Sequence, residues 1–229
     1  MVVADLHVHT TNSDGSLTLE TLPDAAEAAG VSTVAVTDHD RLHPDLRTPV
    51  STVGGVTVVH GIELRVETTD GRVDLLGYGA SRTPELTSLI ERLQADRVER
   101  GAAIIDRVEE RLGTDLPIEA REGIGRPHIA EAIATATGYS YAAAFEELIG
   151  EGCPCYVPRD VPTFEAGVAA LEGACSLVGL AHPYRYDDPE SALEHCSALD
   201  AVERFYPYGR DVDPRAVDRA IERYDLVAT

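Results

Sequence analysis

The chain has 229 residues, enough for one barrel-sized core with a small insertion, and its 40 acidic residues against 19 basic ones leave a net charge of −21. Every basic residue is Arg, because no Lys occurs anywhere in the sequence. The imbalance excludes a broad electrostatic surface for nucleic acid. It is typical of a salt-adapted cytoplasmic protein, since excess negative charge destabilises a compact chain unless salt screens it.

The sequence also carries little sign of export or of a membrane span. The N-terminus does not resemble a signal peptide, and no apolar run approaches the roughly 18 residues of a membrane helix. We therefore expect a reducing cytoplasm, no membrane association and free thiols, while the sequence does not indicate an oligomeric state. The four cysteines lack the spacing of a zinc knuckle and are Cys153, Cys155, Cys175 and Cys196.

The first expected strand ends in two histidines that suit a metal ion. His7 and His9 are two residues apart, so their side chains point to the same face of a strand. Asp14 follows five residues later, in a loop rich in Thr, Asn, Ser and Gly that can fold its carboxylate back over the pair. Two imidazoles and a carboxylate suit Zn, Mn or Fe.

Four more short apolar runs have His, Asp or Glu at or near their ends. His39, Glu63 and His182 come after three of these runs, and Asp74 lies inside the remaining one. Each run is rich in Val or Leu and bounded by turn-forming residues, which predicts buried strands. The runs cover residues 31–37, 55–62, 72–78 and 176–181.

Helical patterns at about 18–29, 164–174 and 189–196 separate several of these expected strands. Such alternation predicts an α/β fold with a mostly parallel sheet or barrel. In these folds the loops at the carboxyl ends of the strands build the active site. The His, Asp and Glu residues at those ends therefore indicate one metal-dependent site.

A long helical pattern interrupts the alternation. Apolar residues recur at steps of three and four from Leu86 to Leu112, and further helical sequence lies at about 128–150. We expect a helical insertion over residues 84–160, beside the mouth of a barrel built from residues 1–83 and 161–229. The histidines outside the expected site, namely His43, His60 and His195, are expected to be structural or surface residues.

Several motifs occur in an order that resembles a known family. They are HVHTTNSDG, AVTDHD, HGIEL, GRPHIA, CYVP, LAHPYRYD and LDAVERF. Together they resemble the PHP (polymerase and histidinol phosphatase) superfamily, specifically its small stand-alone metal-dependent phosphoesterases. The resemblance spans most of the chain. It implies a distorted (β/α)7 barrel with a di- or trinuclear metal site that cleaves phosphate esters.

The resemblance also implies roles for single residues. Arg126 and His128, in GRPHIA, match a segment that approaches the substrate phosphate, and His128 becomes a candidate to protonate the leaving oxygen. Arg185 is a weaker candidate for binding the phosphoryl oxygens. Two or three divalent ions of Mn, Zn or Fe are implied. The positions that match family ligands are His7, His9, Asp14, His39, Glu63 and His182.

The chain departs from the family pattern at two places. Many relatives have a His in a pattern like VHLLGY, where this chain has Asp74 in VDLLGY. A carboxylate there can still bind a hard metal and would favour Mn or Mg over Zn, or it leaves one metal position weak. Relatives also continue from the last strand into Gly-Ser-Asp-x-His, two of whose residues bind metal, whereas this sequence stops at Thr229. We expect either that the polypeptide is cut short or that the pair is lost, with partial metal occupancy and weak hydrolysis in the second case.

The function expected from these features is a metal-dependent phosphoesterase that acts on nucleotides or on RNA or oligonucleotide ends through a metal-activated water. The sequence has no GxSxG elbow and no P-loop pattern, so the nucleophile need not be a side chain. Two alternatives stay open. One is a histidinol-phosphate phosphatase, and the other is a catalytically impaired metal-binding or regulatory module.

Overall fold

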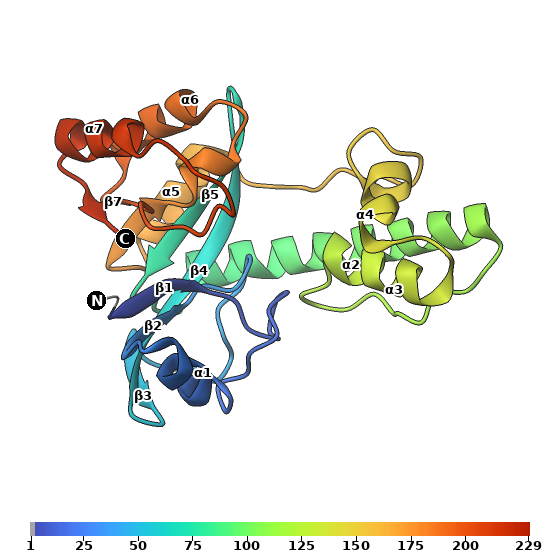
Figure 1. Cartoon of the computed structure of the whole chain (residues 1–229), viewed down its shortest axis with the longest axis horizontal. Coiled ribbons are helices and arrows are strands. Elements are labelled where there is room, and N and C mark those ends of the chain that lie inside the picture. The colour runs from blue at the N-terminus through green and yellow to red at the C-terminus, as the bar shows by residue number, and fades with distance from the viewer. Residues whose placement is uncertain (1–2) are drawn as a thin grey trace.

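The structure is a computed structural model that describes residues 3–229, and it has two lobes (Figure 1). One lobe is a curled sheet with helices packed around it. The other is a smaller helical lobe, which a single long helix, α2 (Pro84–Leu112), connects to the sheet. The α/β class expected from the sequence is confirmed.

The sheet has eight strands, and seven of them follow one continuous path in the order β1-β2-β4-β5-β6-β7-β8, with β3 paired to β4. This path agrees with the expected distorted (β/α)7 barrel. The strands are β1 (Ala4–Val8), β2 (Thr33–Val36), β3 (Val50–Val53), β4 (Val56–Thr68), β5 (Gly71–Tyr78), β6 (Leu177–Leu180), β7 (Ala201–Val202) and β8 (Val227–Ala228).

The sheet is more mixed than the alternation predicts. The pairs β1–β2, β2–β4, β6–β7 and β7–β8 are parallel, whereas β5 runs antiparallel to both β4 and β6. A tight turn at residues 69–70 joins β4 to β5 as a hairpin, which forces β5 to reverse. The start of β5 therefore lies at the edge where the parallel strands end. This explains why Asp74, inside a strand, meets residues that come at the ends of the others.

One expected boundary is wrong in a way that bears on the site. The strand expected over residues 55–62 continues to Thr68, so Glu63 lies inside β4 rather than in a loop after it. The pairing of Glu63 with Leu76 and of Arg65 with Asp74 across the hairpin supports this extension. The backbone of Glu63 is consequently fixed by hydrogen bonds on a rigid strand.

The helices cover the sheet and build the smaller lobe. The expected helices at 18–29, 164–174 and 189–196 are present but shorter, and α7 had no counterpart in the sequence-based expectations. No helix within residues 3–229 has the length and apolar character needed to cross a bilayer. Besides α2, the helices are α1 (Leu22–Ala29), α3 (Arg126–Ala136), α4 (Tyr141–Ala144), which continues as a π-turn over Phe145–Ile149, α5 (Phe164–Glu172), α6 (Pro189–Glu194) and α7 (Arg215–Tyr224).

Helix α2 belongs to two separate hydrophobic cores. Leu86 and Leu93 pack into the main core beneath the sheet, and Ile104 and Val108 pack into the core of the helical lobe. Each such fully buried side chain contributes roughly 1.5–3 kcal/mol. The two cores anchor the two ends of α2, so the middle of the helix lies between the lobes. The assignment of residues 84–160 as a separate insertion stays a prediction.

Candidate metal centre

The loop after β1 is organised around one buried carboxylate. Asp38, which follows β2, accepts hydrogen bonds from the backbone N–H and the hydroxyl of Thr10 (2.7 and 2.8 Å) and from the hydroxyl of Ser13 (2.8 Å). These bonds bend the chain back over the end of the strand. As a result the carboxylate of Asp14 lies 2.8 Å from Nδ1 of His9.

Gly15 completes this bend because no other residue fits there. Its N–H donates to the carbonyl of Thr10, and a Cβ built on it would lie 2.1 Å from the carbonyl oxygen of His9. Glycine at position 15 is thus required for the loop to return onto the strand.

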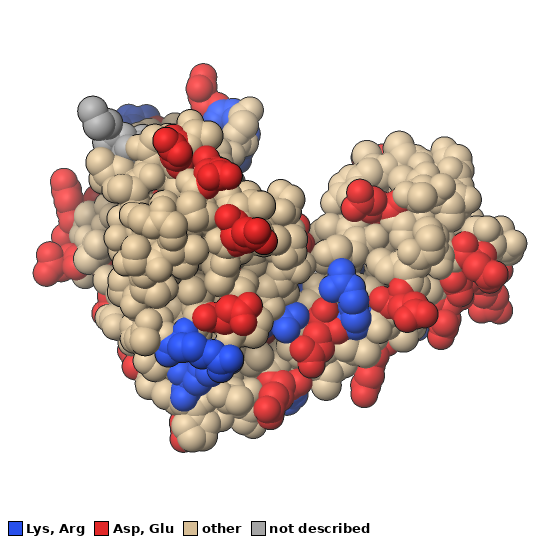
Figure 2. Space-filling model, turned by 90° about the horizontal axis from the view of Figure 1, so that it is seen from below, with Lys and Arg blue, Asp and Glu red and all other residues tan. Residues whose placement is uncertain are grey.

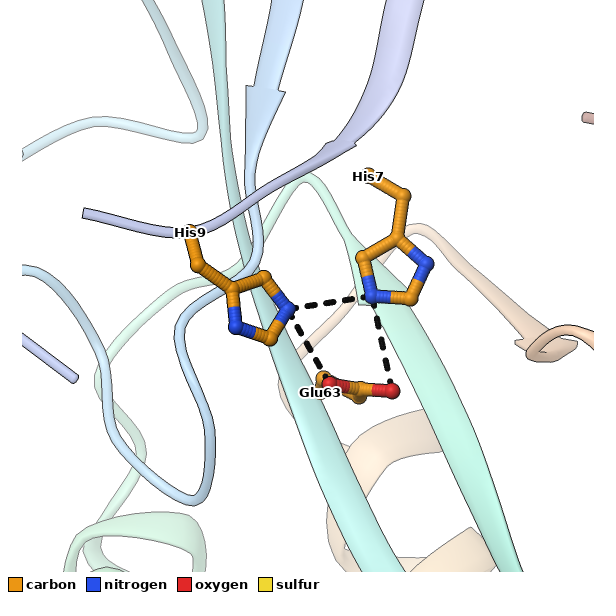
Figure 3. A group of neighbouring side chains, drawn as sticks. All are labelled: His7, His9 and Glu63. Atoms are coloured by element: carbon orange, nitrogen blue, oxygen red, sulfur yellow. Dashed lines mark hydrogen bonds and ion pairs between the residues drawn. The ribbon is translucent and has the colours of Figure 1, made fainter. Parts of the chain in front are cut away.

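The residues expected from the sequence to bind metal converge on one cleft, where their ligand atoms form three adjoining groups. In the first group, Nε2 of His7 and Nε2 of His9 lie 3.1 Å apart, and both face the carboxylate of Glu63 at 3.4 and 3.1 Å (Figure 3). The second group is His9, Asp14 and His39, and the third is Glu63, Asp74 and His182.

Glu63 lies at the centre of all these contacts. Its Oε2 is 2.8 Å from Nδ1 of His39, and its Oε1 is 2.8 Å from Nε2 of His182. Burial alone would raise the pKa of Glu63, but the surrounding imidazoles, His39 foremost, hold it well below its usual range. Glu63 is therefore an ionised carboxylate placed between two sets of nitrogen ligands, the position that a residue bridging two ions would take.

The donor set fits divalent ions. Two imidazole nitrogens 3.1 Å apart need a proton or a cation between their lone pairs. Although burial opposes it, Glu203 and Glu63 raise the pKa of His7 to about 10, and Asp14 and Glu63 raise that of His9 to about 9. A metal ion would compete with protons for these same lone pairs. Buried atoms without a hydrogen bond of good geometry in residues 3–229 include Nδ1 of His39 and Oε2 of Glu63.

Glu203 is a site residue that the sequence analysis missed. This buried carboxylate follows β7, accepts from Nδ1 of His7 at 2.9 Å and accepts the backbone N–H of His182 at 2.6 Å. A carboxylate behind a metal-binding imidazole fixes its tautomer and orientation. The other residues were found as acids or histidines directly after an apolar run, and Glu203 also follows a strand. It was missed because β7 has only two residues, too few to be recognised as an apolar run in the sequence.

His182 adopts a backbone conformation that is costly for a residue with a side chain. Its φ is +27°, in the left-handed region, immediately before Pro183. The hydrogen bond from its N–H to Glu203 and the contact of its ring with Glu63 hold this conformation in place. Such strain concentrates at functional sites, where the surrounding structure fixes it.

The expected substrate-binding residues lie at the rim, with different neighbours. Arg185 lines the metal cleft and donates to the hydroxyl of Tyr206 at 3.0 Å. Arg126 lies in the adjoining cleft, with its guanidinium 5.8 Å from the ring centre of Phe145. His128 instead caps its own helix, since its Nδ1 accepts the N–H of Gly125 at 3.1 Å. A catalytic role for His128 stays a prediction.

His60 lies away from these groups, on the same strand as Glu63. It is 2% exposed, and its Nε2 has no hydrogen-bond partner in the described part of the chain. Burial, together with Arg82 and His43 nearby, lowers the pKa of His60 to about 4. It is therefore a neutral buried histidine, and it does not face the metal cleft.

Comparison with known proteins assigns the family. Residues 5–143 match the PHP domain model. The chain belongs to the PHP domain family. It is 31% identical over 248 residues to the phosphoribosyl 1,2-cyclic phosphate 1,2-diphosphodiesterase of Eggerthella lenta, covering 100% of this chain and 92% of that protein.

Other similar proteins include an exoribonuclease and a solved structure. The 5'-3' exoribonuclease Rnm of Salmonella typhimurium is 30% identical over 200 residues, which cover 81% of this chain and 67% of that protein. A crystal structure from Bifidobacterium adolescentis, provisionally assigned as a metal-dependent phosphoesterase, superposes with a TM-score of 0.77 at 26% identity, covering 99% of this chain and 85% of that one. The PHP chain described here is accordingly a hydrolase of the metal-dependent phosphoesterase class.

Proposed function

We propose that the protein hydrolyses phosphate esters of nucleotides or of RNA or oligonucleotide ends through a metal-activated water. The observation that carries this proposal is an arginine-rich cleft of about 360 Å³ that shares a wall with the metal centre. Asp14 and His39 belong to both clefts, so a substrate with its scissile phosphate at the metal ligands would extend along the arginines. The arginines that line it are Arg65, Arg72, Arg97, Arg100, Arg126, Arg159 and Arg185.

The concentration of arginine is unusual for this molecule. Acidic side chains are scattered over both lobes, with few basic ones among them on the face drawn in Figure 2. Seven of the 19 basic residues nevertheless line this single cleft. Gathering like charges costs free energy unless an anion compensates them, which supports a polyanionic ligand.

The protein compensates only part of that positive charge, because four of the seven arginines have a carboxylate partner within residues 3–229 and three do not. Arg97 and Arg159 share the buried carboxylate of Asp40. Arg100 donates to the carbonyl of Val157 at 2.8 Å, a neutral acceptor. Burial, followed by the repulsion of neighbouring guanidinium groups, lowers the pKa of Arg100 to about 10. A bound phosphate would supply the missing negative charge and accept bidentate hydrogen bonds.

Aromatic side chains stand beside these cations. The guanidinium of Arg126 is 5.8 Å from the ring centre of Phe145 and 5.7 Å from that of Tyr156, and Tyr141 lies against Phe145. Tyr141, Phe145 and Tyr156 all line the cleft. Proteins that bind nucleotides or single-stranded nucleic acids commonly place arginines, which bind the phosphates, next to aromatic side chains, on which the bases stack.

The chain's residues would divide the catalytic work as follows. When bound, divalent ions would lower the pKa of a water toward about 7 and neutralise charge on the phosphoryl oxygens. His7, His9, Asp14, His39, Glu63 and His182 would hold them, with Glu203 orienting His7. Arg185, at the rim of the metal cleft, would neutralise a phosphoryl oxygen, and Arg126 would bind a more distant phosphate. Mn, Zn and Fe all suit this mixture of imidazole and carboxylate.

The cleft also discriminates between the alternative substrates. Histidinol phosphate carries an ammonium group, which the arginines without a carboxylate partner would repel, whereas a nucleotide carries phosphate and an aromatic base. The electrostatics therefore favour nucleotides over histidinol phosphate. The alternative of a regulatory module predicts bound metal without hydrolysis of any ester.

A panel of substrates tests the proposal. The Mn²⁺-loaded protein is assayed with nucleoside monophosphates, nucleoside 3',5'-bisphosphates, a 5'-phosphorylated oligoribonucleotide and histidinol phosphate. We expect the highest kcat/KM for substrates with a second phosphate, and little or none for histidinol phosphate. Preference for histidinol phosphate would refute the assignment to nucleotides, and bound metal with no turnover on the whole panel would support the regulatory module.

A further inference from the structure

The third group of metal-competent atoms differs from the other two because a guanidinium already occupies it. Asp74 is fully buried and receives both of its short contacts from Arg65, with Nε to Oδ1 at 2.7 Å and Nη2 to Oδ2 at 2.5 Å. Nε2 of His182 is farther from Asp74, at 3.7 Å. The carboxylate is thus engaged in a bidentate pair, the strongest arrangement that arginine makes.

The sheet register builds this pair into the fold. Arg65 on β4 stands directly opposite Asp74 on β5, so the two side chains project from the same face of the hairpin. Glu63 is two residues before Arg65 and points to that face as well. The guanidinium is therefore held beside Glu63 and Asp74 by rigid strands, in the place where a third cation would neutralise the same carboxylates.

Arg65 retains donors that face the clefts. Its side chain is 35% exposed, although its partner Asp74 is buried. It lines the metal cleft, the arginine cleft and a third cleft along β5. Asp74 takes two of the five N–H groups of the guanidinium, and those on Nη1 make no hydrogen bond within residues 3–229. These free N–H groups can bind an oxyanion at the border between the two clefts.

We propose that Arg65 takes the place of a third ion, so that the chain binds two divalent ions and uses Arg65 to bind a phosphoryl oxygen of the substrate. The two ions belong to the groups around His7, His9 and Glu63 and around Asp14 and His39. A third ion on Asp74 would lie next to a fixed positive charge, which disfavours it. The phosphate-binding role rests on the proposed function, whereas the number of ions is independent of it.

Counting metal ions tests the first half. The protein is loaded with Mn²⁺, freed of excess ion by gel filtration and analysed for metal per chain, with Mn²⁺ titrations by calorimetry. We expect two ions in the wild type and in Asp74→Asn, and a third, weaker site in Arg65→Ala, because that change releases the Asp74 carboxylate. Arg65→Gln provides a second neutral variant if Arg65→Ala does not fold. Arg219→Ala, which removes an arginine from an exposed pair with Glu190, is the matched control.

Two results would overturn the proposal that Arg65 replaces a third ion. Three ions in the wild type, falling to two in Asp74→Asn, would make Asp74 a metal ligand despite Arg65. Two ions in the wild type and in both folded Arg65 variants would mean that the guanidinium does not exclude the third ion.

Phosphate binding tests the second half without relying on turnover. Inorganic phosphate is titrated into Mn²⁺-loaded Asp74→Asn and into the double variant Asp74→Asn/Arg65→Ala, neither of which can form the third site. We expect the double variant to bind phosphate about tenfold more weakly. Equal affinities would refute the role of Arg65. If the wild type hydrolyses no ester but these results hold, the proposed function fails while the inference about Arg65 stands.

Discussion

The metal centre and the arginine cleft share a wall, yet they handle charge in opposite ways. In the metal centre every imidazole faces a carboxylate, and Glu63 alone contacts His7, His9, His39 and His182. In the arginine cleft seven guanidinium groups gather around two buried carboxylates, Asp40, which two of them share, and Asp74, which pairs with Arg65. The first region offers paired ligands that suit cations, and the second gathers guanidinium groups that suit anions.

The difference separates two tasks that a phosphoesterase must perform. Ligands for an ion have to be paired and rigid before the ion arrives, so the metal centre lies on strand ends with hydrogen-bonded supports. A surface for a substrate can keep unpaired charge, because the substrate supplies the counter-charge and gains affinity from it. The following predictions test whether the two regions act independently.

The largest effect is expected in the metal centre. Changing both His7 and His9 to Ala removes two nitrogen ligands from one strand face, so bound metal should fall to background. Because a metal ion contributes several kcal/mol to such reactions, kcat/KM should fall by about 1000-fold or more. Metal analysis and phosphatase assays measure both, with His43→Gln as a control outside the cleft. Unchanged metal content in the double variant would contradict the assignment.

A smaller and more selective effect is expected in the arginine cleft. Arg126→Ala should raise KM for nucleoside 3',5'-bisphosphates by about 10- to 100-fold, the value of one charge-assisted hydrogen bond, and should leave a simple aryl monophosphate unaffected. Metal content should not change. Arg92→Ala, from an exposed pair with Asp160, is the control. Equal losses on both substrates would mean that the two regions are not separate.

Glu203 should affect the metal centre through His7. The Glu203→Gln variant keeps the shape of the side chain but loses its charge, which should lower metal affinity by about 10- to 100-fold. Activity should return at saturating Mn²⁺, because the direct ligands remain. Chelator titrations measure the affinity, and exposed Glu190→Gln serves as the control. Lost activity that excess metal does not restore would assign Glu203 a different role.

Salt should act in opposite directions on the stability of the fold and on phosphate binding in the arginine cleft. The net charge of −21 makes the fold repel itself at low ionic strength, and molar salt shortens the Debye length from about 10 to about 3 Å. We expect Tm to rise by roughly 10 °C between 0.1 and 3 M KCl, while phosphate binding in the arginine cleft weakens. A flat Tm would exclude salt adaptation.

The smallest expected effect lies outside both regions, at His60. Its pKa is about 4 in the fold, below the ordinary value of 6.5, so the unfolded chain takes up the proton first. Its contribution to stability is complete above pH 6.5 and is lost as the pH falls toward 4. Relative to His60→Gln, the wild type should lose unfolding free energy over that range in urea titrations. If the difference in unfolding free energy between the wild type and His60→Gln stays constant over this pH range, the prediction is wrong.

Much of the site could be predicted because its residues follow a local rule. His7 and His9 alternate on one strand, and His39 and His182 come where apolar runs end, so short-range periodicity was sufficient. The α/β class followed from the same runs. Short-range periodicity was not sufficient in two places. It ended β4 before Glu63, although the strand continues to Thr68, and it did not reveal Glu203, because β7 has only two residues.

The arginine cleft could not be predicted in the same way. Arg97 and Arg100 come from α2, Arg126 from the start of α3 and Arg159 from the segment that returns to the sheet. These elements meet through packing between lobes, which no local pattern encodes. The partnership of Arg65 with Asp74 was missed for a related reason, because it depends on the register of a hairpin that reverses a strand expected to be parallel.

The two cores at the ends of α2 have a consequence for substrate length. A helix advances about 1.5 Å and turns by about 100° with each residue, so the 29 residues of α2 extend for about 44 Å. Inserting one residue between Leu93 and Arg97 would rotate the guanidinium groups of α2 away from the cleft. Inserting seven would turn them back toward the cleft but move them about 10 Å along the helix axis. If the substrate extends along the arginine cleft as proposed, the length of α2 would set how far that cleft reaches from the metal ligands, and we expect relatives with a longer or shorter helix to prefer substrates of different reach.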